Sequence, residues 1–331
     1  MAREKQSALS RREQREAADR RQRLITTGVI GALAVVGGII AVGLYVTQYQ
    51  APRAHVLTVE GRDYSTSDVA RRGTYYALFE GGYQQGTAGL VSATVALLVD
   101  DEVYRRRAPA LVGAVGDAEV EQDLRARYGL EDSADRKQFA DSLQAELRNS
   151  GLSQQEYYDI IAARLLRARV AESLRETLSP IAEQVRLARI RLVSSGEAEE
   201  VRELALGGAD FAELVLERTA DSDNRENEGD LGWFMLELLD AEVAEAVTDL
   251  EAGAVTAVIP SGLFFDVYIV WEREPERELD EAQTAELTGR LLNDWREQER
   301  ALVAITFDLS IGEEEWIVNR VVGDVSAVLD Q

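Results

Sequence analysis

Few side chains in this sequence could act as nucleophiles, proton shuttles or soft metal ligands. The 331 residues include no cysteine and a single histidine, His55. Without cysteine the chain forms no disulfide, thiolate zinc site or thiol nucleophile, and one histidine cannot build a histidine-rich zinc site. A serine–histidine–aspartate triad would need His55, which lies just after an apolar segment, in a poor setting for a pocket. The composition therefore excludes most covalent and metal chemistry.

The other group of chemically active side chains is an acidic loop, residues 221–226, which reads DSDNRE. Its carboxylates are spaced somewhat like those of a calcium-binding loop. Arg225, however, stands at the fifth position, where such loops supply an oxygen ligand, and the sixth position lacks the required glycine. We therefore predict a solvated loop, with no metal and no cofactor.

Charge is distributed unevenly along the chain. There are 36 Lys and Arg residues against 60 Asp and Glu residues, a formal net charge of −24. Residues 1–23 have the opposite sign, with eight basic and four acidic side chains. The acidic body argues against a nucleic-acid partner, because phosphates must be met by a basic face. A short basic head before an acidic body instead indicates a membrane.

Residues 24–46 form an uninterrupted apolar stretch, inside a window without charge between Arg23 and Arg53. A helix of this length spans about 34 Å, enough to cross a hydrocarbon core of about 30 Å. The apolar region of a cleaved signal peptide is shorter, at roughly 7–15 residues. A buried core helix is the other alternative. The positive-inside rule predicts a single-pass protein of the cell membrane, with residues 1–23 cytoplasmic and the chain after about residue 50 extracytoplasmic.

The same stretch contains two pairs of small residues four apart: Ala34 with Gly38, and Gly37 with Ala41. Such pairs let membrane helices pack closely, which leaves a homodimer open.

Residues 52–180 are predicted to be mostly helical after a short strand at His55–Val59. Apolar residues recur at helical spacing in four stretches: 89–107, 117–128, 136–149 and 153–174. Ser153 and Glu156 form a capping-box pattern at the start of the last stretch. Pro180 then interrupts the helical pattern.

Residues 181–275 have a different periodicity. The order strand, helix, helix, strand, helix, strand, strand predicts an α+β domain with a small antiparallel sheet. The strands are expected at 186–193, around 229–234, at 255–259 and at 264–271. Residues 276–331 follow as a tail, with a helix from Leu279 to Ile305 and a helix or strand of unassigned role from Trp316 to Leu329.

Three phrases in residues 181–275 resemble the parvulin (PpiC-type, rotamase) family of peptidyl-prolyl isomerases. They are GGADFAEL at 207–214, GDLGWF at 229–234 and LEAGAVT at 250–256. Three looser phrases resemble the SurA-type chaperone domain: VEGRDYS at 59–65, VGDAEV at 115–120 and GLSQQEY at 151–157. The chain as a whole is similar to membrane-anchored foldases of the SurA/PrsA kind. In such proteins a C-terminal segment returns to the N-terminal helical domain, and the helix in 276–331 resembles that return.

This resemblance implies rotation about X–Pro bonds in unfolded or proline-containing exported polypeptides. Amide resonance gives that rotation a barrier of about 18–20 kcal/mol, and no bond is made or broken. A catalyst needs an apolar pocket for the proline ring and polar groups that favour the twisted amide over the planar one.

The family site maps onto this sequence with altered residue types. Ile190 stands at the histidine of the first strand, and Asp266 at the histidine of the last strand. The central Cys or Asp position of the loop falls near Ser222, within a residue or two. These three are the expected catalytic positions. The expected substrate-binding residues, which include the proline pocket, are Leu239, Val243, Ser261 and Phe265.

Loss of both histidines implies reduced isomerase activity, because an aspartate cannot replace a buried neutral imidazole without a desolvation cost or a raised pKa. The alternatives are a non-catalytic holdase for unfolded segments and an envelope scaffold that kept only the fold. Leu231, Trp233 and Phe234 are expected to be core residues rather than binding residues.

Overall fold

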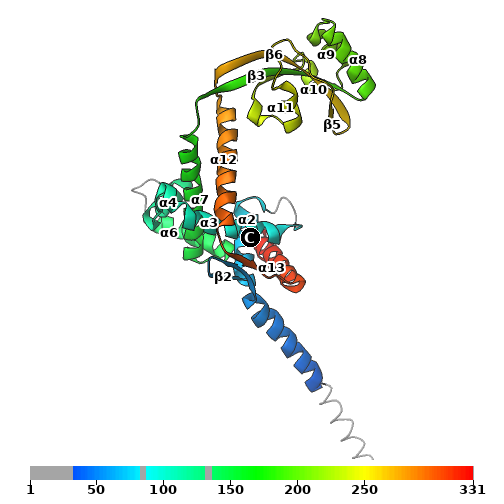
Figure 1. Ribbon diagram of the computed structural model, residues 1–331. Coiled ribbons are helices and arrows are strands. Elements are labelled where there is room, and N and C mark those ends of the chain that lie inside the picture. Colours follow the sequence, from blue (N-terminus) through cyan, green and yellow to red (C-terminus); the bar gives the residue numbers. More distant parts are fainter. Residues whose placement is uncertain (1–32, 83–86, 131–135, 331) are drawn as a thin grey trace, which may run out of the picture. The chain divides into compact units, whose positions relative to one another are not determined.

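The computed structural model describes residues 33–82, 87–130 and 136–330, and the chain divides into two compact units (Figure 1). The flanking unit comprises Met1–Leu166 together with Gln298–Gln331, and the inserted unit comprises Arg167–Glu297. Two helices, α7 (Gln154–Arg175) and α12 (Glu281–Ala301), carry the chain across the boundaries. Helices with small antiparallel sheets make this an α+β fold, as the sequence predicted.

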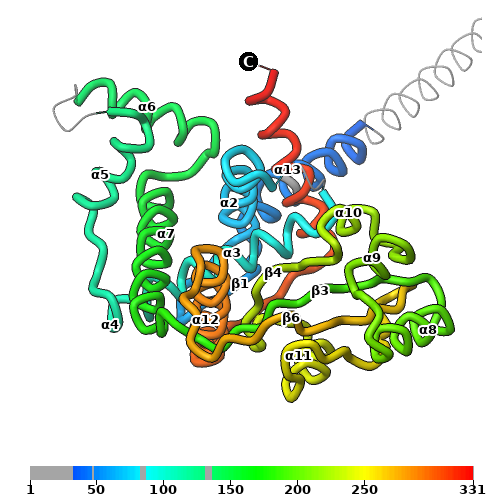
Figure 2. The backbone as a smooth tube through the Cα atoms, turned by 90° about the horizontal axis from the view of Figure 1, so that it is seen from above, coloured from blue at the N-terminus to red at the C-terminus, as the bar shows by residue number. Residues whose placement is uncertain are grey.

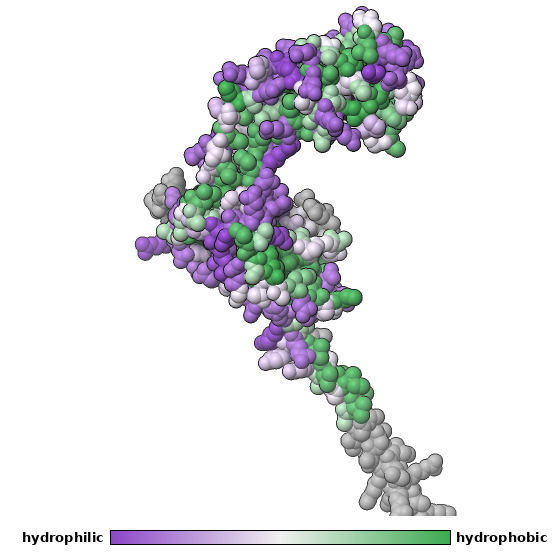
Figure 3. All heavy atoms as spheres, viewed as in Figure 1, coloured by the Kyte–Doolittle hydropathy of each residue, from purple (hydrophilic) through white to green (hydrophobic). Residues whose placement is uncertain are grey.

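The apolar N-terminal helix is described from Leu33 and continues to Arg53, ending as η1 (Val46–Gln50) and η2 (Ala51–Arg53). By length and composition it is a candidate membrane span. Its apolar side chains are exposed, and Figure 3 shows the helix as a hydrophobic stretch. That exposure does not fit a buried core helix. The predicted head 1–23 and residues 24–32 lie outside the described residues.

The flanking unit combines a three-stranded sheet with helices. Its strands are β1 (His55–Val59), β2 (Arg62–Ser65) and β7 (Ile305–Phe307), in the order β2-β1-β7. Its helices, besides the start of α7, are α2 (Thr66–Phe79), α3 (Leu90–Arg107), α4 (Pro109–Val112), α5 (Asp117–Arg127), α6 (Arg136–Ser150) and α13 (Ile311–Leu329). The helical stretches expected here are confirmed, as is the strand at His55–Val59.

Local capping explains where several of these helices begin. The Ser153 N–H donates to Glu156 Oε2 at 2.8 Å, and the Glu156 N–H donates to Ser153 Oγ at 3.3 Å, which confirms the predicted capping box of α7. A reciprocal box of the same kind, between Ser310 and Glu313, starts α13. These side chains satisfy N–H groups that a helix start leaves without partners.

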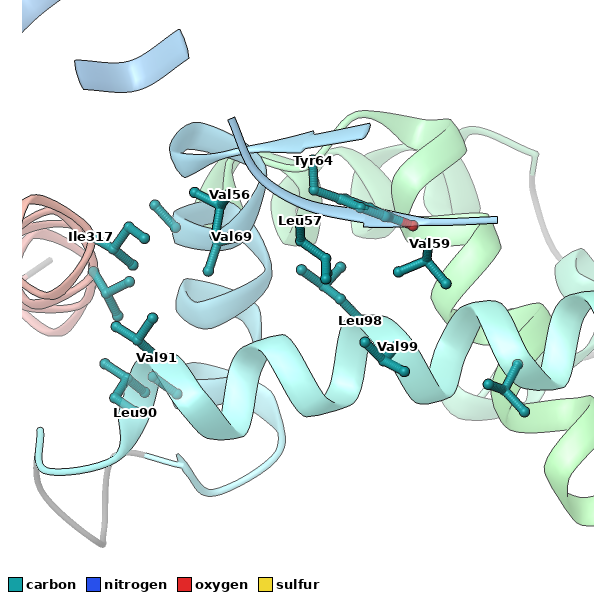
Figure 4. Close-up of a cluster of buried hydrophobic side chains, with 14 of the residues drawn as sticks. Val56, Leu57, Val59, Tyr64, Val69, Leu90, Val91, Leu98, Val99 and Ile317 are labelled. Carbon is teal, nitrogen blue, oxygen red and sulfur yellow. The ribbon is translucent and has the colours of Figure 1, made fainter. Parts of the chain in front are cut away.

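The C-terminal tail completes the hydrophobic core of the flanking unit. Ile317 of α13 is 1% exposed and lies near Val56 of β1 and Val69 of α2 (Figure 4). A Cβ added to Gly73 of α2 would stand 3.1 Å from a methyl group of Val321, so the glycine permits the close approach of α13. The segment Trp316–Leu329, which had no assigned role, is therefore part of the core.

β7 corrects the helix predicted from Leu279 to Ile305. The helix ends at Ala301, and Ile305 instead begins a strand that pairs with Val59 of β1. The edge of β1 has backbone N–H and C=O groups that need hydrogen-bond partners, and a longer helix would leave them without any. Pairing with β1 therefore overrides the local helical pattern.

The inserted unit has a four-stranded antiparallel sheet in the order β4-β3-β6-β5. The strands are β3 (Ile181–Leu192), β4 (Asp230–Met235), β5 (Ile259–Ser261) and β6 (Phe264–Glu278). The helices are α8 (Ser195–Leu206), α9 (Phe211–Arg218), α10 (Ser222–Arg225), η4 (Leu236–Leu238) and α11 (Ala241–Val247).

The predicted bounds of the strand at 255–259 are wrong. Val255 forms only an isolated bridge with Ile269, and the strand β5 begins at Ile259. The reason lies at Thr256, whose N–H donates to Tyr268 O while its hydroxyl accepts from the Tyr268 N–H. A side-chain oxygen thus replaces a backbone carbonyl, and the regular ladder is interrupted there.

The two faces of this sheet have separate cores. Figure 2 shows helix α11 apart from α8 and α9. On β3, Ala188, Ile190 and Leu192 pack with α8 and α9, whereas Val185 and Leu187 pack with α11. This alternation follows from the period of two along a strand. The face that carries α11 is called the α11 face below.

Candidate functional site

Four charged or polar side chains meet on the α11 face where β3 and β6 lie side by side. Arg189 pairs with Tyr268 in the sheet register, and Arg191 pairs with Asp266. Both arginines follow Leu187 at intervals of two, so their side chains lie on the same face as Leu187. Tyr268 belongs to the α11-face core, which confirms that placement.

Asp266 is the centre of this group. Its side chain is 1% exposed, and it accepts two hydrogen bonds from Arg191, from Nε at 2.8 Å and from Nη2 at 2.7 Å. Nη2 of Arg191 also donates to Ser261 Oγ of β5 at 3.3 Å. The Arg191 guanidinium lies 5.4 Å from the ring centroid of Phe264. This bidentate geometry is the strong form of an ion pair.

Asp221 joins the group from the connection between α9 and α10. The Ala220 N–H donates to Arg191 O at 2.7 Å, and the Arg191 N–H donates to Thr219 Oγ1 at 3.2 Å, which fixes the connection against the end of β3. Asp221 caps α10 and accepts a hydrogen bond from Nη2 of Arg189. Nη1 of Arg189 lies 3.9 Å from Asp266. Two guanidinium groups therefore alternate with two carboxylates.

These contacts shift pKa values away from neutrality. Burial alone would raise the pKa of Asp221, but the hydrogen bond and charge of Arg189 outweigh it, so the pKa is lowered. The hydrogen bonds to Asp266 raise the pKa of Arg191 above its ordinary value. Burial, followed by the charge of Asp266, raises the pKa of Tyr268. The three groups thus keep one charge state through the neutral pH range.

The structure brings together some of the predicted site residues. Asp266 and Ser261 both contact Arg191, and Leu239 and Val243 pack in the α11-face core together with Tyr268. Asp266 and Ser261 therefore share one polar contact, beside the apolar positions expected to hold a proline ring.

Other predicted site residues lie elsewhere. Ile190 is fully buried on the opposite face, against α8 and α9, and Phe265 is partly buried there too. Ser222 is the exposed first residue of α10, with its hydroxyl 3.4 Å from Asp223 Oδ1. Alternation in the sheet explains these positions, because the neighbours of Arg191 and Asp266 must face the other way.

Sequence reasoning missed Arg189, Arg191, Asp221 and Phe264. Strand parity alone would have placed the two arginines on one face, and Asp221 is one residue from the position assigned to the loop. Parity does not say which face of the sheet the arginines lie on, because that depends on which strand residues the helices bury.

The GDLGWF motif shapes the backbone beside the site. Gly229 has φ of +84°, and a Cβ there would stand 2.8 Å from Arg189 O and 2.7 Å from Val215 Cγ2. Glycine thus allows the motif to reach the β3 backbone. Leu231 and Phe234 pack against the α11-face core, as predicted.

Trp233 is only partly buried and lies against the Arg277 guanidinium, whose carbon is 4.3 Å from the ring centroid. Trp233, which was predicted to be a core residue, belongs to neither core of this unit.

The arrangement suits binding of a neutral group more than proton transfer. Within the described ranges, no group of three or more histidine or acidic side chains is placed to hold a metal ion. Nη2 of Arg189 and Nε and Nη2 of Arg191 are directed at carboxylates or at Ser261, whereas Nε of Arg189 is buried without a hydrogen-bond partner among the described residues.

Comparison with known proteins agrees with the sheet and motif. Residues 192–272 match the model of the Rotamase family, described as the PPIC-type PPIASE domain. The inserted unit therefore contains a parvulin-type domain. The chain is similar to the foldase protein PrsA of Oceanobacillus iheyensis, with 29% identity over 147 residues, which cover 37% of this chain and 48% of that protein. The chain thus spans about half the length of the curated relative it matches.

Two solved structures are more distant. PrsA of Bacillus cereus has 14% identity and a TM-score of 0.40, covering 84% of this chain and 98% of that one. A structure described as SurA-like chaperones of Campylobacter jejuni has 16% identity and a TM-score of 0.28, covering 57% of this chain and 89% of that one. At such low scores the family assignment rests on the sequence matches.

Proposed function

We propose that this chain is a membrane-anchored extracytoplasmic foldase that binds unfolded or proline-containing exported polypeptides. We further propose that its PpiC-type domain isomerises X–Pro bonds weakly. The observation that carries the second part is the bidentate pair of Arg191 with Asp266 on the α11 face.

The physical reason is that the arginine and aspartate side chains of the site already form hydrogen bonds with one another. Twisting an X–Pro amide removes its conjugation, and a catalyst accelerates the twist only through contacts that strengthen in the twisted state. Arg191 and Asp266 already satisfy one another, and Arg189 donates to Asp221. A substrate must therefore compete with an existing charge-assisted hydrogen bond before it gains one. Leu239 and Val243, which pack in the α11-face core, are the positions that we propose to contact a proline ring.

The test is NMR exchange spectroscopy on an X–Pro peptide with the full chain in lipid nanodiscs. We expect exchange slightly faster than in empty nanodiscs. The rate should rise in Asp221→Asn, which releases Arg189 from its carboxylate partner, and should not change in the matched variant Asp223→Asn. A rate equal to the empty-nanodisc control would refute isomerase activity and leave the holdase, for which suppression of aggregation of an unfolded protein is the readout. No effect in either assay would favour the scaffold.

The anchoring part of the proposal is supported by the exposed apolar helix Leu33–Arg53. Tyr45 and Tyr49 stack near its end, with centroids 5.3 Å apart, and Arg53 lies over the Tyr49 ring. Aromatic and basic residues at one end suit a membrane–water interface. The predicted homodimer remains a prediction.

Because the chain has no native cysteine, single cysteines report topology cleanly. We expect Ala257→Cys to react with an impermeant maleimide in intact cells, and Ser7→Cys to react only after lysis. The reverse labelling pattern would overturn the orientation.

A further inference from the structure

An open groove with a volume of about 420 Å³ lies within the inserted unit, away from the parvulin-type site. It is lined by the segment before β3, by the end of β4 with η4, and by one side of α12. Its large apolar residues are Leu178, Ile181, Met235, Leu279, Leu287 and Leu291. Ile181 is 41% exposed, and Leu178, Leu279, Leu287 and Leu291 are half-buried. Scattered exposed aliphatics are normal on a surface, but several in one groove are not.

The walls of the groove are fixed by buried hydrogen bonds. Gln283 of α12 donates from Nε2 to Gln184 Oε1 at 3.0 Å and to Trp233 O at 3.2 Å. Gln184 is fully buried, and its own Nε2 donates to the carbonyls of Arg277 and Glu278. Because α12 is tied to the sheet in this way, the groove is preformed rather than created by a ligand.

The rim of the groove is acidic. Glu237 and Asp294 line it, and its one lining guanidinium, Arg290, is turned to the carbonyls of η4 and paired with Glu286 at 2.9 Å.

A second hollow, of about 440 Å³, shares Leu279 with the groove. Its other lining residues are Glu274, Glu276, Arg277, Glu278 and Asp280, and Arg277 pairs with Glu274 at 3.5 Å. Carboxylates therefore outnumber cations over both hollows.

We propose that this groove binds an extended client segment in which large apolar side chains adjoin lysine or arginine. The aliphatic floor would take the apolar side chains, and the acidic hollow beyond Leu279 would take the basic ones. Charge complementarity favours this occupant over an acidic one, because like charges across an interface repel each other. The inference rests on the proposed foldase function and adds a second binding site, with a stated client chemistry, to it.

The experiment measures fluorescence anisotropy of a labelled, proline-free peptide with a leucine–phenylalanine–leucine–valine centre and two lysines at each end. The full chain is held in nanodiscs, and empty nanodiscs are the blank. We expect the double variant Ile181→Gln with Leu291→Gln to bind at least ten-fold more weakly. Leu206→Gln, which removes a 57% exposed leucine at the end of α8, serves as the matched control and should bind normally.

Charge is tested separately. Glu276→Gln with Glu278→Gln should weaken binding of the lysine peptide and flatten its dependence on salt, and the same peptide with glutamates at its ends should not bind. Leu291→Met, which keeps volume and apolarity, should retain binding and so shows that the groove needs an apolar side chain at this position. An unchanged proline exchange rate in the double variant excludes a folding defect of the inserted unit as the cause. Equal binding of the lysine and glutamate peptides would overturn the proposal.

The proline exchange assay, run on the same variants, separates this inference from the proposed isomerase. Groove variants should leave the exchange rate unchanged. If the unaltered chain binds the lysine peptide but does not accelerate proline exchange, the result counts against the isomerase and not against the groove. Unchanged peptide binding by the double variant would refute the groove. A concentration-dependent self-association that the double variant abolishes, with no peptide binding, would identify a second copy of this chain as the occupant and overturn the proposal.

Discussion

The two units each bury a carboxylate among arginines, but they surround it differently. In the flanking unit, Glu102 of α3 is 2% exposed and accepts hydrogen bonds from Tyr64, Arg62, Arg105 and Arg106 at 2.6–2.8 Å. Burial opposes ionisation, but these donors outweigh it and lower the pKa of Glu102. Two of these donors come from β2 and two from α3, so Glu102 holds the strand against the helix.

In the inserted unit, Asp266 is equally buried, yet it accepts hydrogen bonds from Arg191 alone, with Arg189 farther away at 3.9 Å. Arg191 keeps a quarter of its side chain exposed. The difference teaches that a buried ion pair with surplus donors stabilises a fold, whereas one with few donors and an open edge belongs to a surface that can meet a ligand.

The largest expected effect is in the flanking unit. Glu102→Gln should destabilise that unit by about 3–5 kcal/mol, because it leaves several buried cationic donors without their shared acceptor. Hydrogen–deuterium exchange of α3 in the full chain measures the loss. The control is Glu299→Gln, which breaks a more exposed pair with Arg107 and should cost about 0–1 kcal/mol. Unchanged exchange in α3 would contradict the comparison.

The next effect tests how the backbone positions the inserted-unit site. Gly229→Ala should destabilise the unit by about 2–4 kcal/mol, since it adds left-handed strain to overlap with Arg189 O. Gly232→Ala is the matched control, because Gly232 also has positive φ but open space around its Cβ position. Equal exchange of β3 in the two variants would show that the close approach does not matter.

Asp266→Asn should cost about 1–3 kcal/mol in the same unit, less than Glu102→Gln in the other. The penalty is smaller because Arg191 can turn to water and Arg189 keeps Asp221. The measurement is hydrogen exchange of β6. A loss as large as that caused by Glu102→Gln would break the comparison between the two carboxylates.

Asp101, the neighbour of Glu102, should make stability depend on pH in the opposite direction to Glu102, because its pKa is raised and that of Glu102 is lowered. Burial raises the pKa of Asp101 to about 6, and the charge of Arg72 offsets only part of this. An unfolded carboxyl titrates near 3.9, so the folded unit holds this proton more tightly. The stability contributed by Asp101 is therefore present at low pH and is lost as pH rises through about 6.

Fluorine NMR of the chain labelled with fluorotryptophan can follow this change, because Trp316 is the flanking unit's tryptophan. Between pH 5 and 7 we expect urea to unfold the flanking unit more easily as pH rises, with a flatter dependence in Asp101→Asn. The same slope in both chains would assign the effect to other groups.

The smallest effect is expected for Ser261→Ala, which removes one hydrogen bond of 3.3 Å from Arg191. Because Arg191 is partly exposed, water can replace the hydroxyl, and the cost should stay within about 0.5–1.5 kcal/mol. Thermal unfolding measures it. A larger loss would mean that Ser261 holds the pair in place.

Local signals in the sequence account for much of the fold. The capping box at Ser153 and Glu156 and the helical spacing in residues 52–180 depend on neighbours three or four residues away, so they are readable. The pairing of Ile305 with Val59 depends on two distant segments, and no local pattern contains it. Thr256 interrupts a strand through a side-chain hydrogen bond that spacing alone does not reveal.

The site was predictable in region but not in geometry. Matching motif positions selected Asp266 and Ser261, which do meet at Arg191. The same procedure selected Ile190, whose side chain faces the opposite core. Residue identity along a strand says nothing about which face the helices cover, and a shift of one position exchanges the faces.

The completion of the flanking unit by β7 and α13 has a consequence for the order in which the units fold during synthesis. Residues 167–297 contain all four strands of their sheet, so this unit can fold as soon as it emerges. The flanking unit can complete its fold only after residues 298–331 are made. Until then β1 lacks its partner β7, and α2 lacks its contacts with Ile317 and Val321. A chain truncated before β7 would therefore display an unpaired strand edge and an open core just beyond the N-terminal helix, a combination prone to aggregation.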